Sequence, residues 1–148
     1  MKTPAILLLL VPLQAFAAEG TVAKRELSLG GVAIGDTAAQ VAARLGEPKH
    51  KVAAQDFLDL HYEYASLRVS FNGGIVAGLH ADKRDACTPK GLCPGDRLDR
   101  MRALYGAPVV ADRETGRFYE YVGGDAACWL QIRAKGGRVA SISVACQP

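Results

Sequence analysis

The side chains that could carry out chemistry in this chain of 148 residues are four cysteines, three histidines and several neighbouring carboxylates. His61, Glu63 and His80 are acceptable ligands for a divalent metal ion, because proteins hold such ions with imidazole nitrogens and carboxylate oxygens. They occur in two different strand-like segments, however, and exposed sheet faces commonly carry such residues. We therefore predict no metal site and no cofactor.

The sequence does not favour acid–base or nucleophilic catalysis. Two pairs of nearby carboxylates, Asp56 with Asp59 and Asp112 with Glu114, have no apolar pocket evident around them. The G-x-S-x-G turn that presents a serine nucleophile in α/β-hydrolases does not occur in the chain. We therefore expect a protein that is not an enzyme.

The cysteines fit structural disulfides better than metal or redox chemistry. An even number of cysteines is typical of disulfide pairing in exported proteins. The chain has no C-x-x-C motif of the kind that zinc and redox sites use. Four cysteines allow three pairings, and the strand register given below favours one of them.

Residues 1–17 have the layout of a secretory signal peptide, with one lysine, an apolar run and an Ala15-Phe16-Ala17 exit. Cleavage after Ala17 would place the mature chain in the periplasm or outside the cell. The apolar run is shorter than the roughly 20 residues that cross a bilayer, and no cysteine follows it for lipidation, so we expect no membrane anchor. The net charge of +3 includes no long basic run, so we expect no nucleic-acid partner.

The segment 31–48 recurs as 91–108, with six identities in eighteen ungapped positions. Asp36 and Asp96 stand where each apolar helical stripe begins, and we expect their carboxylates to cap the first turn. Gly46 and Gly106 end the stripes, and a proline two residues later prevents continuation. The duplication therefore predicts two copies of one structural unit, not a catalytic motif. The identical pairs are Gly31/Gly91, Gly35/Gly95, Asp36/Asp96, Ala43/Ala103, Gly46/Gly106 and Pro48/Pro108.

Each predicted helix is followed by three strand-like segments, and Tyr-Glu-Tyr occurs in the first of them in both copies. Glycine pairs at 73–74 and 136–137 are typical of hairpin turns between the last two strands. We therefore predict an α+β fold of two tandem helix-plus-three-strand repeats, 24–84 and 85–148, forming one antiparallel sheet with both helices on one face. The expected strands are 57–64, 67–71 and 75–81, then 117–121, 130–134 and 138–146.

Alternation along the last hairpin fixes a register. Centring the turn on Gly137 places Cys128 opposite Cys146, and the core pairs Leu130/Val144 and Ile132/Ile142 follow from the same register. This predicts a Cys128–Cys146 disulfide and leaves Cys87 to pair with Cys93.

The side of the sheet opposite the helices is the predicted binding surface. It would carry Trp129, Phe118 and Arg133 from the second copy and His61 from the first. An exposed tryptophan beside an aromatic ring and an arginine has the composition of a protein-binding hot spot. The alternative is that Trp129 folds over a sheet edge or is covered by the insertion at 123–125. We predict that these four residues contact a protein partner.

The residues that begin and end the first helix resemble the BamE (SmpA/OmlA) and β-lactamase-inhibitor-protein-like superfamily, and 91–108 repeats them more loosely. The resemblance implies an exported, non-catalytic protein-binding module, inhibiting or neutralising a secreted or periplasmic enzyme through the open sheet face. The alternative is an envelope-assembly accessory that resembles BamE without its lipid anchor. Another protein is the expected partner in both cases. The matching residues are Gly31, Gly35, Asp36, Thr37, Val41, Leu45, Gly46 and Pro48.

Overall fold

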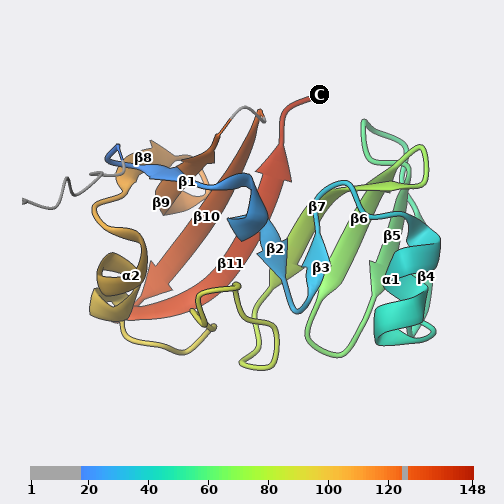
Figure 1. Ribbon diagram of the computed structural model, residues 1–148, viewed down its shortest axis with the longest axis horizontal. Coiled ribbons are helices and arrows are strands. Elements are labelled where there is room, and N and C mark those ends of the chain that lie inside the picture. Colours follow the sequence, from blue (N-terminus) through green and yellow to red (C-terminus); the bar gives the residue numbers. More distant parts are fainter. Residues whose placement is uncertain (1–17, 125–126) are drawn as a thin grey trace, which may run out of the picture.

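The computed structural model describes residues 18–124 and 127–148, and most of its regular structure is β-sheet. Nine strands form one mixed sheet in the order β1-β9-β10-β11-β7-β6-β5-β4, and β8 also pairs with β9. The sheet is antiparallel except that β1 runs parallel to β9. Figure 1 shows β11 and β7 side by side near the middle of this sheet. The N-terminal elements are β1 (Thr21–Val22), the 3-10 helix η1 (Lys24–Glu26), β2 (Ser28–Leu29) and β3 (Val32–Ala33).

Each of two short α-helices is followed by four antiparallel strands. Helix α1 (Ala38–Leu45) precedes β4 (His50–Ala53), β5 (Leu60–Glu63), β6 (Arg68–Asn72) and β7 (Ile75–Ala81). Helix α2 (Leu98–Tyr105) precedes β8 (Val109–Arg113), β9 (Gly116–Gly123), β10 (Cys128–Lys135) and β11 (Arg138–Cys146). The predicted fold class, two tandem helix-plus-three-strand repeats in an antiparallel sheet, is therefore wrong. The chain instead folds around one sheet of nine strands, in which parallel and antiparallel pairs are mixed.

Strands β4 and β8 were not predicted from the sequence, and the same physical cause explains both omissions. All four residues of β4 are exposed, and β8 exposes Val109 and Val110 by 49% and 50%. Edge strands with solvent on both faces lack the alternation of apolar and polar residues that identifies a half-buried strand. Neither segment therefore shows a period of two in the sequence.

Asp36 and Asp96 are not helix N-caps, which corrects the sequence-based prediction. Thr37 caps α1, and its side chain and that of Gln40 bond each other's backbone N–H groups in a capping box. Arg97 occupies the N-cap position of α2 and makes no capping bond with its side chain. The aspartates instead accept backbone N–H groups three residues earlier, from Ala33 to Asp36 and from Cys93 to Asp96, at 2.9 Å each.

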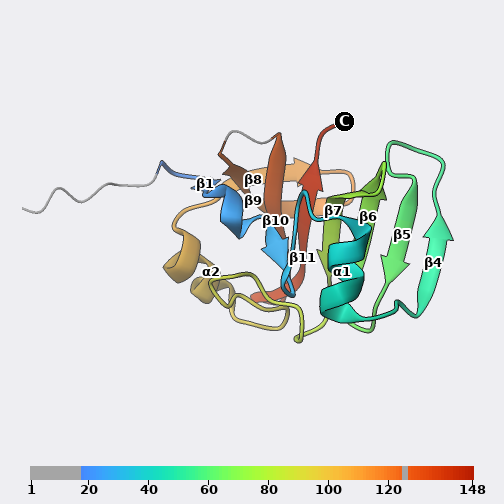
Figure 2. The same ribbon diagram turned by 45° about the vertical axis from the view of Figure 1, so that its right-hand side comes forward.

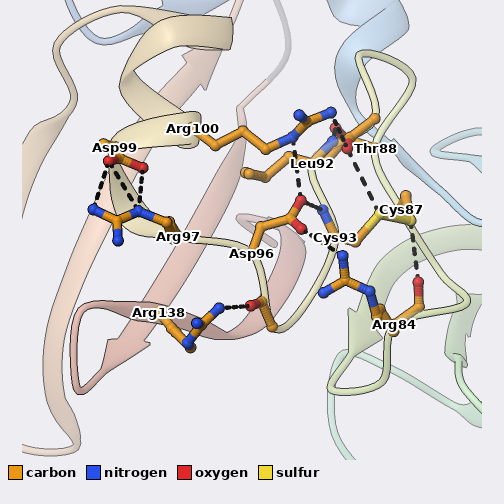
Figure 3. A network of polar contacts seen from close by, with 12 residues as sticks. Arg84, Cys87, Thr88, Leu92, Cys93, Asp96, Arg97, Asp99, Arg100 and Arg138 are labelled. Carbon is orange, nitrogen blue, oxygen red and sulfur yellow. Dashed lines mark hydrogen bonds and ion pairs between the residues drawn. A yellow bond between two sulfur atoms is a disulfide. The ribbon is translucent and has the colours of Figure 1, made fainter.

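The side chain of Asp96, in the loop that precedes α2, is the centre of a polar network (Figure 3). Its carboxylate is 9% exposed and accepts from Arg84 at 3.0 Å, while Arg100 of the helix lies 3.3 Å away. Asp36 has the corresponding ion pair with Arg44 of α1. The duplicated aspartate therefore fastens a helix to the loop that precedes it.

The duplicated glycine explains how each loop joins the sheet. Gly35 and Gly95 have positive φ values of 91° and 93°, which an L side chain rarely adopts. Their N–H groups donate to the carbonyl oxygens of Val76 and Val139, at 2.9 and 2.7 Å. Both loops therefore pair with the return strand of the Gly-Gly hairpin in their own half.

One hydrophobic core runs under both helices. Val41 of α1 and Met101 of α2 are fully buried and belong to the same cluster as Leu130 and Val144 of the sheet. The short β2-β3 hairpin covers the seam between the halves, since β2 contacts both β7 and β11. Figure 2 shows this hairpin and α1 lying in front of the sheet strands. Burial of these apolar groups therefore joins the halves on one side of the sheet and leaves its other side open.

The register of the last hairpin is confirmed. Cys128 lies opposite Cys146, and the Leu130/Val144 and Ile132/Ile142 pairs follow. The structure contains both predicted disulfides, Cys128–Cys146 and Cys87–Cys93. In the first half, a shift in register between Ser70 and Phe71 places Phe71 opposite Val76, and Val76 is buried in the core.

The predicted signal peptide and its cleavage after Ala17 lie outside the described residues. Within 18–124 and 127–148, no helix has the length and apolar character needed to cross a membrane.

Candidate functional site

The candidate site is the side of the sheet that carries no helix, here called the open face. Two ladders of directly opposed residues cross it. The polar ladder is Glu120, Gln131, Ser143, His80, Arg68 and Glu63, one residue from each of β9, β10, β11, β7, β6 and β5. The small-residue ladder is Val122, Trp129, Ala145, Gly78, Ser70 and His61, from the same strands.

A hollow of about 250 Å³ lies at the middle of the small-residue ladder. Gly78 supplies no side chain there, and Ala145 beside it supplies only a methyl group. Phe57 and Leu58, from the loop between β4 and β5, form one wall, and the polar ladder forms the other. Phe57 is 39% exposed, so the hollow combines an accessible apolar wall with a polar rim.

Two serine–histidine pairs fix side chains on the open face. The Nδ1 atom of His80 lies 2.8 Å from Oγ of Ser143, and Nδ1 of His61 lies 2.8 Å from Oγ of Ser70. Both pairs bridge neighbouring strands, so the rings are fixed before any ligand arrives. Partial burial lowers the pKa of His80 below its ordinary value, Asp82 opposes this, and Arg68 adds to it.

Glu120 is the group on the open face that sequence reasoning did not select. Its carboxylate is only 7% exposed and accepts from Arg113 at 2.5 Å and from Gln131 at 2.9 Å. A buried carboxylate is stable only when its oxygen atoms are paired. Two features of the sequence could have identified it. Glu120 is the middle residue of the Tyr-Glu-Tyr triplet that both halves share, and the side chains of its strand point alternately to the core and to the open face.

The structure divides the four predicted contact residues between two places on the open face. Trp129 and His61 belong to the small-residue ladder, on either side of Gly78. They are four strand steps apart, or about 19 Å at the usual strand spacing. Phe118 and Arg133 are direct cross-strand neighbours on β9 and β10. Phe118 and Trp129 are each partly exposed, whereas Arg133 is exposed.

The open face combines fixed polar groups with a hollow. Each histidine meets its serine through Nδ1, and the two imidazole–serine pairs lie on a shallow sheet surface with no enclosing cavity. Within the described part of the chain, no three or more His, Cys, Asp or Glu residues are grouped closely enough to hold a metal ion. What the open face offers is a preformed hollow, fixed hydrogen-bonding groups and partly exposed aromatic rings.

Comparisons with known proteins identify similar folds only. No protein-family model matches the chain, and no curated protein matches it. An extracellular protein containing an SCP domain from Bacillus anthracis is 8% identical, with a TM-score of 0.57 over 94% of this chain and 50% of that one. A cysteine-rich secretory protein from Staphylococcus aureus is 10% identical, with a TM-score of 0.59 over 87% of this chain and 49% of that one. The chain thus spans about half the length of these two proteins.

A third similar structure matches over most of its own length. The DUF4309 family protein YjgB from Bacillus subtilis is 14% identical, with a TM-score of 0.53 over 79% of this chain and 83% of that one. The expected membership of the BamE and β-lactamase-inhibitor-protein-like superfamily is therefore wrong, because the matching folds are SCP-domain and DUF4309 proteins. The motif behind that expectation consists of loop glycines, a loop aspartate and helix ends, which any chain with such helix–sheet joints can contain.

The extracellular neighbours and the two disulfides are consistent with a secreted or periplasmic protein.

Proposed function

We propose that this chain is an exported, non-catalytic protein-binding module, and that its partner binds across the open face with one side chain seated in the hollow at Gly78. Export would use residues 1–17 as a signal peptide. A partner held over the sheet would be sterically occluded, which is how the module would neutralise a secreted or periplasmic enzyme.

The observation that carries the proposal is the hollow itself. Binding hot spots are anchor side chains that fill pockets, surrounded by polar groups that exclude water. Gly78 and Ala145 leave room for an anchor, Phe57 offers it apolar contact, and His80 and Ser143 on the rim are already hydrogen bonded. Because these rim groups are preorganised, binding would cost little of their conformational entropy.

Filling the hollow gives a direct test. A Cβ atom added to Gly78 would lie 3.4 Å from Cβ of Ser70 and 3.7 Å from the carbonyl oxygen of Val144, and φ is not in the positive region. Gly78→Ala should therefore fold normally, and Gly78→Leu should occupy the hollow. Ala43→Leu, at an exposed position of α1, adds similar apolar bulk away from the open face.

The full chain is expressed with its own N-terminus, purified with intact disulfides, and used to capture proteins from periplasmic and outer-membrane fractions. A captured protein is then purified and titrated against each variant. We expect stoichiometric binding of a soluble protein by wild type and Ala43→Leu, and at least tenfold weaker binding by Gly78→Leu and Trp129→Ala. Equal binding by wild type and Gly78→Leu would overturn the proposal. Capture of an outer-membrane complex whose binding is unchanged by Gly78→Leu and Trp129→Ala would instead favour an envelope accessory.

A further inference from the structure

A second depression of the open face, here called the basic depression, has a strongly cationic wall. It has a volume of about 460 Å³ and lies at the end of β10 and β11 nearest their shared turn. Arg133 and Lys135 form one wall, His80 and Asp82 stand on the other, and Ala140 and Ser141 make the floor. The floor is low because the register shifts between Arg133 and Ala134, which leaves Ala140 without a partner on β10.

Within the described part of the chain, the two cations of this wall have no counter-ion. Among residues 18–124 and 127–148, neither Arg133 nor Lys135 lies within 4.0 Å of a carboxylate oxygen. Nearby arginines differ, since Arg113 pairs with Glu120 at 2.5 Å and Arg117 pairs with Asp112 at 2.7 Å. Among the described residues, the charges of Arg133 and Lys135 are thus left unneutralised at this corner of the open face.

A like-charge pair concentrates that charge further. Lys135 lies directly opposite Arg138 across the hairpin, and like charges at opposed positions destabilise a sheet. Arg138 donates to the carbonyl oxygen of Gly95 at 3.0 Å, but this contact brings no negative charge. The chain therefore carries an electrostatic cost that an anionic ligand would remove.

Asp82 does not supply the missing charge. It directly follows β7, whose last residue Ala81 pairs with Ile142, so it stands about two strands from Arg133, or about 10 Å at the usual strand spacing. The space between them is the depression, and Phe118 lies on the other side of Arg133. Aromatic residues and arginine are both enriched in protein interfaces.

We propose that the partner presents an acidic polypeptide segment to the basic depression, where its carboxylates bind Arg133 and Lys135. This inference rests on the proposed function and gives the chemistry of the partner. The segment would lie next to the Gly78 hollow, because His80 lines both depressions. Arg133 can bind a carboxylate in two-point fashion, and Lys135 adds a point charge.

An octaglutamate peptide is the probe, added to ¹⁵N-labelled full-length protein at 50 mM NaCl. We expect amide shifts confined to residues around 133–141, and loss of the shifts at 500 mM NaCl because the contacts are exposed. The double substitution Arg133→Gln with Lys135→Gln should weaken binding at least tenfold. Asp82→Asn should strengthen it about twofold, since it removes one repelling charge at about 10 Å.

The matched control is Lys24→Gln with Lys49→Gln, which removes the same net charge from two exposed lysines outside the open face. If this control lost peptide binding to the same extent, net charge alone would explain the loss in the Arg133/Lys135 double variant, and the inference would be overturned. Binding of inorganic polyphosphate or of anionic phosphatidylglycerol vesicles, with none of octaglutamate, would also overturn it.

Capture of the natural partner separates the two proposals. If Gly78→Leu abolishes capture while the Arg133/Lys135 double variant captures normally, the acidic-segment inference fails and the proposed function stands. If the double variant loses the partner while Gly78→Leu retains it, the basic depression is the binding site and the hollow is not.

Discussion

The hydroxyl of Tyr121 donates a hydrogen bond to the carbonyl oxygen of Gly106, 2.8 Å away. This bond ties strand β9 to the residue that ends α2. Tyr64 and Gly46 make the equivalent bond at 3.1 Å in the first half. The second tyrosine of each Tyr-Glu-Tyr triplet therefore fixes the end of the preceding helix, which explains why the triplet and the helix-ending glycine recur together.

The tyrosine bond predicts a loss of stability at alkaline pH. Burial raises the pKa of Tyr121 from its ordinary value of 10.0 to about 12, against a smaller opposing effect of Arg102. The unfolded chain therefore loses this proton first, so the stabilisation is complete below pH of about 10 and is lost as pH rises towards 12. Denaturant titrations between pH 9 and 12 should show a shallower decline for Tyr121→Phe than for wild type. Parallel declines would contradict the assignment.

Replacing Asp96 should lower the free energy of unfolding more than replacing Arg97, the residue at the N-cap position of α2. Asp96→Ala would leave the N–H of Cys93 without its acceptor and release Arg84 and Arg100, and we expect a cost of about 1–3 kcal/mol in the free energy of unfolding. Arg97→Ala removes no capping bond and should change it by less than about 0.5 kcal/mol. Urea denaturation of the two variants measures the difference, and a reversed order would contradict the described network.

Thr37 provides the complementary test in the first half. Thr37→Ala breaks the capping box with Gln40 and should cost about 0.5–2 kcal/mol in the same measurement. Thr37→Ser keeps the hydroxyl and serves as the control. An equal cost in both variants would mean that the hydroxyl bond is not what stabilises the start of α1.

The two disulfides should contribute unequally to stability. Cys128–Cys146 spans 18 residues and Cys87–Cys93 spans 6, and loop-closure entropy gives roughly 3 and 2 kcal/mol, respectively. Replacing both cysteines of a pair by alanine and measuring urea unfolding tests the order. A larger loss from the 87/93 pair would show that this bond supports native structure beyond its loop, namely the turn that Asp96 holds.

The imidazole of His80 should titrate below its ordinary pKa of 6.5. NMR titration of the ring protons measures it directly. Arg68→Gln should raise the pKa of His80, because a neighbouring cation is removed, and Asp82→Asn should lower it further. Titration of the wild-type ring above 6.5 would contradict its packing on the open face.

Local patterns in the sequence predicted the two helices, the two hairpins that turn at glycine pairs, and most of the inward-facing side chains. The Cys128–Cys146 register followed because alternation, a glycine turn and two cysteines specify the same pairing. Edge strands could not be found this way, because β4 packs nothing against its faces. The parallel pairing of Thr21 with Val122 joins residues too distant in the chain for any local pattern to predict.

The candidate site was only partly predictable for a related reason. Alternation placed Trp129, Phe118, Arg133 and His61 on the open face. The hollow at Gly78 depends on which small residues meet across three strands, and the basic depression depends on a bulge at Ala140. Such features arise from the register between paired strands, which composition does not encode.

The position of β11 constrains the order of folding. This strand lies at the centre of the sheet and joins the two halves through its pairing with β7, yet it follows every other strand along the chain. The first half therefore has an unsatisfied inner edge on β7 until residue 146 has emerged. Most other strand pairs join neighbours in the chain and can form early, whereas the pairing of β7 with β11 must wait for the last strand. We therefore expect this long-range pairing to be the slow step that unites the two halves.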